Sequence, residues 1–248
     1  MSKRTPEQEM ALRTRRGFLT LGLGAAAGIA GWELLRHGAD EDGLAAGFRR
    51  VQAFNERVTS GTLFRPGHLA PVFPVSRAEA PRANGDEGLT DDVEDDDWRL
   101  ELTRYHESQA GRKLEMSDIR KLPKAEHVTE FKCIEGWSTV VHWGGARLAD
   151  FTAAFAAGSE RAQYVGLRTP NGEYYAGVDT PSALHPQTLL AYEMNGEPLS
   201  DEHGAPLRLV IPVKYGIKNL KRIGSLTYTD TRPPDYWAER GYDYYAGL

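Results

Sequence analysis

A single thiol stands among aromatic side chains near the middle of the sequence. Cys133 is the only cysteine of the 248 residues, and Trp137, His142 and Trp143 follow it closely. One cysteine cannot form an intramolecular disulfide. Three roles remain open for this thiol on residue type alone: a buried apolar side chain, a nucleophile, or a ligand for a soft metal.

A second group of residues has the composition of an anion site. Arg208, Lys214, Lys218 and the pair Lys221-Arg222 surround a glycine turn at Gly216. Cationic side chains beside the backbone N–H groups of such a turn bind phosphate well. A solvated basic loop would have the same composition, so both interpretations stay open at this point.

The N-terminal residues 1–38 have the pattern of an export signal. Basic residues precede an apolar run from Gly17 to Leu35. The string "TRRGFLT" contains Arg15-Arg16 and resembles the twin-arginine signal, which serves proteins that are already folded. We therefore expect the rest of the chain in the periplasm or on the exported side of the cytoplasmic membrane. The sequence leaves open whether the signal is cleaved or remains as a membrane anchor.

Between the signal and the main domain, residues 39–97 form an irregular N-terminal segment. Prolines are scattered through it without a sustained period. Residues 86–97 carry eight carboxylates and no basic residue. A solvated loop, a docking surface for a basic partner and a calcium loop are alternatives for this acidic stretch. The net charge of −5 argues against nucleic acid as a partner.

From residue 98 onward, short strands alternate with few helices. This order is typical of an α+β fold, which must position the thiol and the basic turn. The strand predicted at 127–133 ends at the cysteine itself. Further strands are predicted at 98–104, 162–169, 173–179 and within 205–230, and residues 188–199 are predicted as two strands joined by a turn at Asn195-Gly196. Helices are predicted at 47–57, 116–123 and 146–157.

Three stretches together resemble a known family. They are "FKCIEGWSTVVHWGGARLADF" (Phe131–Phe151), the segment His185–Ile223 with "GAPLRL" and "KYGIK", and "RPPDYW" (Arg232–Trp237). They resemble the molybdenum-binding domain of the sulfite oxidase superfamily, most closely the catalytic subunits of periplasmic methionine sulfoxide reductases. The resemblance extends over residues 98–237 and places the main domain at 98–248.

The resemblance implies a sulfite-oxidase-type molybdopterin-binding domain with mixed β-sheets and short helices, and a molybdenum–molybdopterin (Mo-MPT) cofactor. Cys133 matches the thiolate that binds molybdenum, and Trp137 and His142 are expected as catalytic residues in the wall of the site. The residues that match cofactor contacts, besides Cys133, are Asn55, Arg57, Thr169, His203, Arg208, Gly216, Ile217 and Lys218.

The implied reaction is oxygen-atom transfer, with electrons from a haem-containing membrane subunit or a c-type cytochrome. Sulfite oxidases bind their anion with arginines just after the ligand cysteine, whereas no arginine lies between Cys133 and Arg147 here. This difference favours a neutral sulfoxide or related oxide, small or protein-bound. A sulfite dehydrogenase and a non-catalytic accessory subunit of a respiratory complex remain alternatives. The end at Leu248, before any dimerisation domain of that family, leads us to expect a monomeric catalytic subunit.

Overall fold

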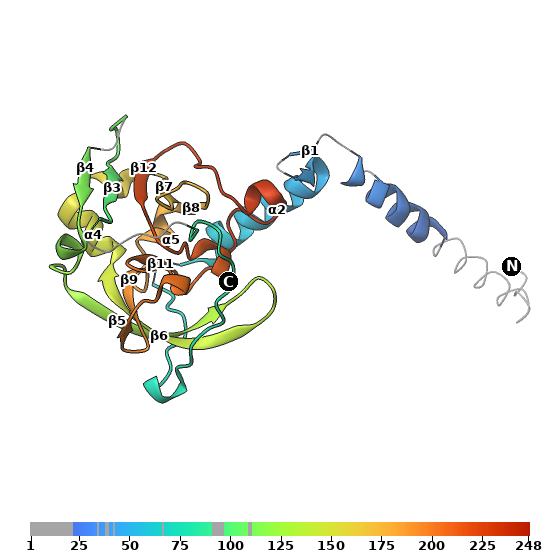
Figure 1. The fold of residues 1–248 in the computed structure, drawn as a ribbon. Coiled ribbons are helices and arrows are strands. Elements are labelled where there is room, and N and C mark those ends of the chain that lie inside the picture. The colour runs from blue at the N-terminus through green and yellow to red at the C-terminus, as the bar shows by residue number, and fades with distance from the viewer. Residues whose placement is uncertain are drawn as a thin grey trace, which may run out of the picture. The chain divides into compact units, whose positions relative to one another are not determined.

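The computed structural model of the protein describes residues 22–33, 35–37, 40–41, 43–65, 67–90, 97–108 and 111–248 (Figure 1). The twin-arginine pair and residues 91–96 of the acidic stretch lie outside these residues. The chain divides into two units, Met1–Ala53 and Phe54–Leu248. The domain boundaries predicted after residues 38 and 97 stay predictions.

In the first unit, residues 22–33 are helical, and β1 (Asp40–Glu41) pairs with β2 (Leu44–Ala45). The helix predicted at 47–57 is α2 (Ala46–Val58), whose last turns belong to the second unit. No helix among the described residues is long and apolar enough to cross a membrane.

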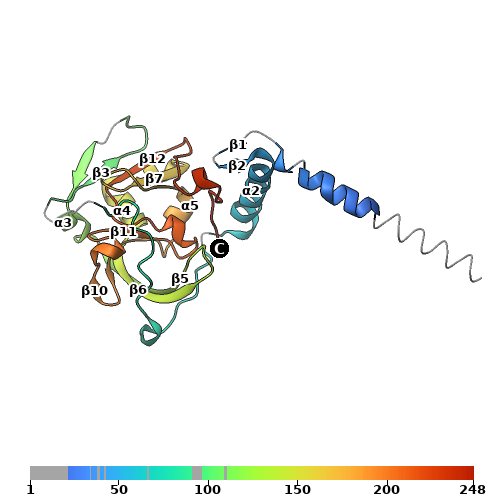
Figure 2. The same ribbon diagram turned by 45° about the vertical axis from the view of Figure 1, so that its right-hand side comes forward.

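The second unit contains two sheets. In the first, the strand order is β10-β9-β6-β5, with β11 also paired to β9, and every pairing is antiparallel. Figure 2 shows β5 and β6 as one long curved hairpin. The strands are β5 (Lys124–Lys132), β6 (Ser138–Arg147), β9 (Leu189–Met194), β10 (Glu197–Pro198) and β11 (Arg208–Val210).

The second sheet is mixed, with the order β4-β3-β12-β7-β8. Its central pair, β3 and β12, is parallel, with Leu102 opposite Leu226, while the other pairs are antiparallel. The strands are β3 (Leu100–Thr103), β4 (Arg112–Leu114), β7 (Tyr164–Arg168), β8 (Tyr175–Asp179) and β12 (Ser225–Thr229).

The helices of the second unit are short and connect the strands. The α-helices are α3 (Met116–Ile119), α4 (Leu148–Phe155) and α5 (Thr180–Ala183). The remaining turns are the π-helix η1 (Thr59–Leu63) and the 3-10 helices η2 (Val75–Arg77), η3 (Ser159–Arg161), η4 (Asp201–His203), η5 (Gly216–Lys218) and η6 (Ala238–Arg240). Mixed sheets with few short helices confirm the α+β prediction.

The core follows the alternation of the strands. The larger apolar cluster combines Leu100 and Leu102 of β3, Leu226 of β12, Leu190 of β9 and Phe151 of α4, all without exposed surface. Since it draws on both sheets and α4, this one cluster holds the sheets together.

The strand β6 was not predicted, and it corrects the helix expected at 146–157. Ala146 and Arg147 end β6, so α4 begins only at Leu148. The pairing of β6 with β9 is irregular between Gly144 and Gly145. A Cβ on Gly145 would lie 2.2 Å from the carbonyl oxygen of Leu190, so only glycine allows this close backbone approach.

Candidate active site

A five-residue turn holds the thiol at the end of the β5–β6 hairpin. The strands pair from Lys124↔Ala146 to Lys132↔Ser138, which leaves Cys133 to Trp137 as the loop. The Cys133 N–H donates to the Trp137 carbonyl at 2.9 Å, and the Gly136 N–H donates to the Cys133 carbonyl at 3.1 Å. Gly136 has a φ of 92°, which favours glycine. The position of the thiol is therefore fixed by a long hairpin and its closed turn.

A cleft of about 870 Å³, measured out to its open mouth, lies beside Cys133. Four stretches of chain supply nearly all of its lining: 81–87, the hairpin end with Trp143, 203–221, and 237–242. The hairpin brings the cysteine, and the segment after β10 brings the basic residues. The cleft thus joins the two groups of residues that the sequence separates by about 75 positions.

Polar side chains next to the thiol form a small network. The amide nitrogen of Asn84 lies 3.8 Å from the Cys133 Sγ and donates to the Glu135 carboxylate at 3.3 Å. The indole N–H of Trp137 donates to the same carboxylate oxygen at 3.1 Å. A carboxylate is thereby held at the cleft wall, two residues from the thiol.

Arg208 is the buried cation of the cleft. It is 3 % exposed, and its Nη1 and Nη2 donate to the carbonyls of His203 at 2.9 Å and Asn219 at 3.3 Å. The guanidinium lies 4.8 Å from the centre of the Trp143 ring. No carboxylate pairs with it in the described part of the chain. Burial lowers the pKa of Arg208 to about 10, so it remains charged at neutral pH.

Two donors in this wall have no protein partner among the described residues. They are the Nε of Arg208 and the Nε1 of Trp143, both buried. Leaving a buried donor unsatisfied costs on the order of 1–3 kcal/mol. An anionic ligand rich in acceptor atoms would satisfy both donors and the unpaired charge. The wall therefore fits a phosphate-bearing heterocycle, such as a pterin with its phosphate.

Lys221 is the second cation of the cleft. Its Nζ donates to the carbonyls of Asn84 and Gly85, each at 2.9 Å, and no ion pair to it is found in the described residues. Burial, and then the charge of Arg208, lower the pKa of Lys221 to about 8. The same two causes, in the same order, lower the pKa of His203. The cleft wall is thus a place where positive charge is unfavourable until an anion binds.

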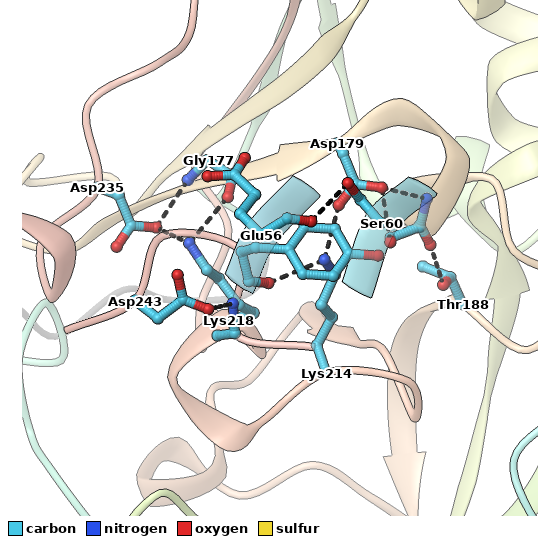
Figure 3. A network of polar contacts seen from close by, with 12 residues as sticks. Glu56, Ser60, Gly177, Asp179, Thr188, Lys214, Lys218, Asp235 and Asp243 are labelled. Atoms are coloured by element: carbon cyan, nitrogen blue, oxygen red, sulfur yellow. Dashed lines mark hydrogen bonds and ion pairs between the residues drawn. The ribbon is translucent and has the colours of Figure 1, made fainter. Parts of the chain in front are cut away.

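The other lysines of the basic segment are neutralised inside the protein (Figure 3). The Lys218 ammonium contacts the Asp235 carboxylate and the Gly177 carbonyl, the latter at 3.0 Å. Lys214 donates to Asp179 at 2.7 Å and to the Tyr245 carbonyl at 2.8 Å. The cluster seen in the sequence therefore divides: Arg208 and Lys221 line the cleft, whereas Lys214 and Lys218 do not.

The structure brings together about half of the site residues predicted from the sequence. The predicted residues that line the cleft are Cys133, Trp137, His203, Arg208, Gly216 and Ile217. Five others are not among its lining residues. These are Asn55, Arg57, His142, Thr169 and Lys218.

Each of the other five has a different environment. Asn55 and Arg57 are exposed on α2. The imidazole of His142 lies 3.4 Å from the Glu126 carboxylate. The Thr169 hydroxyl donates within its own turn, to the Asn171 side chain at 2.8 Å. The structure thus gives these four side chains no place in the cleft wall, and the Lys218 ammonium is held by Asp235.

Several lining residues were not predicted. The position of Glu135, two residues after the candidate ligand cysteine, could have identified it as a lining residue. Asn84 comes from the segment interpreted as irregular. Trp237 ends the "RPPDYW" stretch, which carried the resemblance but gave it no role at the site, and nothing local marks Tyr242. Lys221 was assigned to the basic cluster without a role of its own.

Lys221 gives the protein without cofactor a specific pH dependence. Its folded-state pKa of about 8 lies below the ordinary value of a lysine, so its burial penalty is complete below about pH 8. The penalty is lost as the pH rises from about 8 to about 10.5. We therefore expect Lys221→Met to be more stable than the wild type at neutral pH, with the difference shrinking over that interval. Urea unfolding at a series of pH values measures it.

The exposed Lys113, in a surface pair with Glu101, supplies the control. Lys113→Met should show a small stability difference from the wild type that does not narrow above pH 8. A pH-independent difference for Lys221→Met would show that its ammonium carries no burial penalty.

Comparison with known proteins identifies the family to which the chain is similar. A family model described as "Oxidoreductase molybdopterin binding domain" matches residues 87–237. The chain is 32 % identical, over 95 % of its length and 88 % of the relative, to a putative protein-methionine-sulfoxide reductase subunit YedZ1 of Azospira oryzae. It is 35 % identical to the protein-methionine-sulfoxide reductase catalytic subunit MsrP of Xanthomonas campestris, over 48 % of the chain and 41 % of that protein.

Among solved structures, the sulfane dehydrogenase SoxCD from Paracoccus pantotrophus is similar, with a TM-score of 0.51. The match covers 57 % of this chain and 40 % of that one at 19 % identity, and it supports the fold. The chain spans between 41 % and 56 % of the length of the MsrP relatives that it matches.

Proposed function

Because this chain belongs to the family of oxidoreductase molybdopterin-binding domains, we propose that it is the catalytic part of an exported enzyme that reduces a sulfoxide of the methionine-sulfoxide type. Family membership confirms the predicted resemblance, the enzyme class and the Mo-MPT cofactor. The substrate, the electron donor and the location are the proposed part.

The residues of the cleft fit the family's cofactor. The bound group supplies two-electron oxygen-atom transfer. Cys133 would hold the molybdenum, because a thiolate is the soft ligand this centre requires. Arg208, Lys221 and the indole N–H of Trp143 would hold the acceptor-rich pterin and its phosphate. Gly216 and Ile217 would add backbone contacts at the edge of the same wall.

One observation carries the choice of substrate: the hairpin residues next to the thiol contribute a carboxylate and aromatic rings and no arginine of their own, and the nearby Arg82 guanidinium lies 6.0 Å from the centre of the Trp137 ring. Glu135 lies two residues after Cys133, and the Trp137 indole donates to it. A carboxylate in this position repels an anion such as sulfite. A neutral sulfoxide has an apolar body that suits the rings. Its reduction consumes two electrons and two protons and releases a thioether and water, and Glu135 is placed to pass a proton.

A haem protein is the proposed electron donor, because the one cysteine of the sequence cannot bind molybdenum and also supply the set of thiolates that an iron–sulfur cluster needs. The relatives named above are described as subunits, which supports a partner for this chain as well. The location on the exported side rests on the twin-arginine string alone.

The test is a substrate panel on protein purified from a molybdenum-replete host. Reduction of methionine sulfoxide by a reduced viologen dye is expected, with at least about tenfold lower kcat/KM for sulfite oxidation with cytochrome c. Stoichiometric molybdenum with sulfite as the better substrate would support the sulfite dehydrogenase, which Arg82 in the cleft lining favours. Molybdenum-free protein, inactive on both, would support an accessory subunit.

A further inference from the structure

The C-terminal residues of the described chain form one wall of the cleft. Trp237 and Tyr242 line it together with Cys133, and their ring centroids are 5.3 Å apart in an edge-to-face arrangement. We propose that these two rings are the specificity-determining residues for the alkyl arm of the sulfoxide, and that the Lys218–Asp235 ion pair positions them. This inference rests on the function proposed above.

The turn that carries the two rings is rigid. The Trp237 carbonyl accepts the N–H groups of Arg240 and Tyr242, both at 3.0 Å. This hydrogen bonding folds residues 237–242 back on themselves around η6. Tyr242 is 37 % exposed, so its ring stands at the open mouth of the cleft, where a substrate must pass.

Asp235 anchors the start of this turn. It is 3 % exposed and accepts the N–H of Ala238 at 2.9 Å and the N–H of Gly177 at 3.1 Å. The Lys218 ammonium contacts the same carboxylate, as Figure 3 shows. Lys218 belongs to η5, whose other residues, Gly216 and Ile217, line the cleft. One ion pair therefore links the aromatic wall to the wall that faces the cofactor.

The chemistry of the wall suits an alkyl sulfur group. Sulfur and its neighbouring methyl and methylene groups make favourable contacts with aromatic rings, typically at the ring edge. Ile134 and Trp137 at the hairpin end add apolar surface to the same cleft. A methionine-type side chain offers a long flexible arm to these rings, whereas dimethyl sulfoxide offers only two methyl groups. The dependence of kcat/KM on the two rings should therefore increase with the length of the alkyl arm of the substrate.

The first test compares Tyr242→Ala with Tyr242→Phe. For N-acetylmethionine sulfoxide, kcat/KM should fall about fivefold to tenfold in the alanine variant and stay within about twofold in the phenylalanine variant. For dimethyl sulfoxide the alanine variant should lose less than about threefold. Titration calorimetry without a reductant, where no turnover occurs, should show the same order in the dissociation constants. Molybdenum content should stay at the wild-type level.

The second test addresses positioning through Asp235→Asn. This change keeps the shape and one acceptor oxygen, replaces the other oxygen by an amide nitrogen that cannot accept, and removes the charge that Lys218 contacts. We expect a higher KM and dissociation constant for N-acetylmethionine sulfoxide with kcat little changed. A purely structural ion pair would instead lower stability and kcat for both substrates in parallel. If the single variant folds poorly, the double variant Lys218→Met, Asp235→Asn also removes the unpaired buried ammonium and keeps one acceptor oxygen for the turn, so its stability should exceed that of the single variant.

The outcomes separate this inference from the proposed function. Wild-type reduction of both sulfoxides with no effect of Tyr242→Ala would overturn the inference alone. Binding that depends on Tyr242 without reduction would overturn the proposed function alone. Absence of binding to the molybdenum-loaded wild type would overturn both.

Discussion

Replacing Cys133 by serine should remove molybdenum from the protein while leaving its fold in place. The thiol is 9 % exposed, and the turn around it is closed by backbone hydrogen bonds that serine keeps. The change in stability should therefore be about 1 kcal/mol. Loss of partners that only orient a metal ligand costs about 10–100-fold in affinity or activity, so loss of the ligand itself should exceed about 100-fold. Metal analysis and sulfoxide reduction measure both effects.

Asn84→Ala is the matched control for Cys133→Ser. Asn84 contacts the thiol and Glu135 without being a candidate ligand. This variant should keep most of its molybdenum and lose activity within the range of about 10–100-fold. Full molybdenum occupancy in Cys133→Ser would contradict the assignment of the ligand.

The second large effect is expected for Arg208→Met: loss of cofactor, with a change in stability limited by two opposing contributions. Lowering the pKa of Arg208 to about 10 corresponds to a penalty of about 3 kcal/mol on the charged form. Methionine removes this penalty and also the two hydrogen bonds to carbonyls, each worth about 1.5–3 kcal/mol. The hydrogen bonds sum to about 3–6 kcal/mol against a penalty of about 3 kcal/mol, so the cofactor-free protein should lose at most about 3 kcal/mol of stability.

The affinity for the cofactor gains nothing from Arg208→Met that would offset the lost charged contact. Truncating one partner of a buried charged contact typically costs about 2–5 kcal/mol, or roughly 30-fold to several thousand-fold in affinity. Pterin content, measured by fluorescence after oxidation, should therefore fall sharply in Arg208→Met. Arg208→Lys keeps the charge but loses the forked donor geometry, so this variant should retain only part of the wild-type pterin content. Normal pterin content in a strongly destabilised Arg208→Met protein would assign Arg208 a structural role instead.

Local sequence patterns predicted most of the helices and strands, but not which basic residues line the cleft and which are paired with carboxylates inside the protein. Alternation and turn residues placed β5, β9 and α4 within a few positions of their bounds. Within β6, the Gly144-Gly145 pair interrupts the alternation, and the structure explains it by the close approach to β9. Composition alone did not distinguish Lys214, Lys218 and Lys221, and the resemblance singled out Lys218. The partners of Lys214 and Lys218, which are Asp179 and Asp235, are brought in only by tertiary structure.

The cleft could be inferred only in part for the same reason. Cys133 and Arg208 stand in long motifs, so their meeting was predictable from a resemblance. Asn84 reaches the cleft from a segment whose local sequence has no period or motif, and Trp237 ends a motif that gave it no role at the site. Asn55 matched a motif only weakly, and it lies exposed on α2.

The parallel pairing of β3 with β12 has a consequence for the order of assembly. The second sheet has β3 and β12 at its centre, and the chain between them must be synthesised before they can pair. The cleft lining likewise includes residues 81–87 and 237–242. Contacts of such long sequence separation require a large loop-closure entropy before they can form. A nascent chain thus has no complete cleft until Tyr242 has left the ribosome, so cofactor occupancy reports that synthesis and folding of the domain are finished.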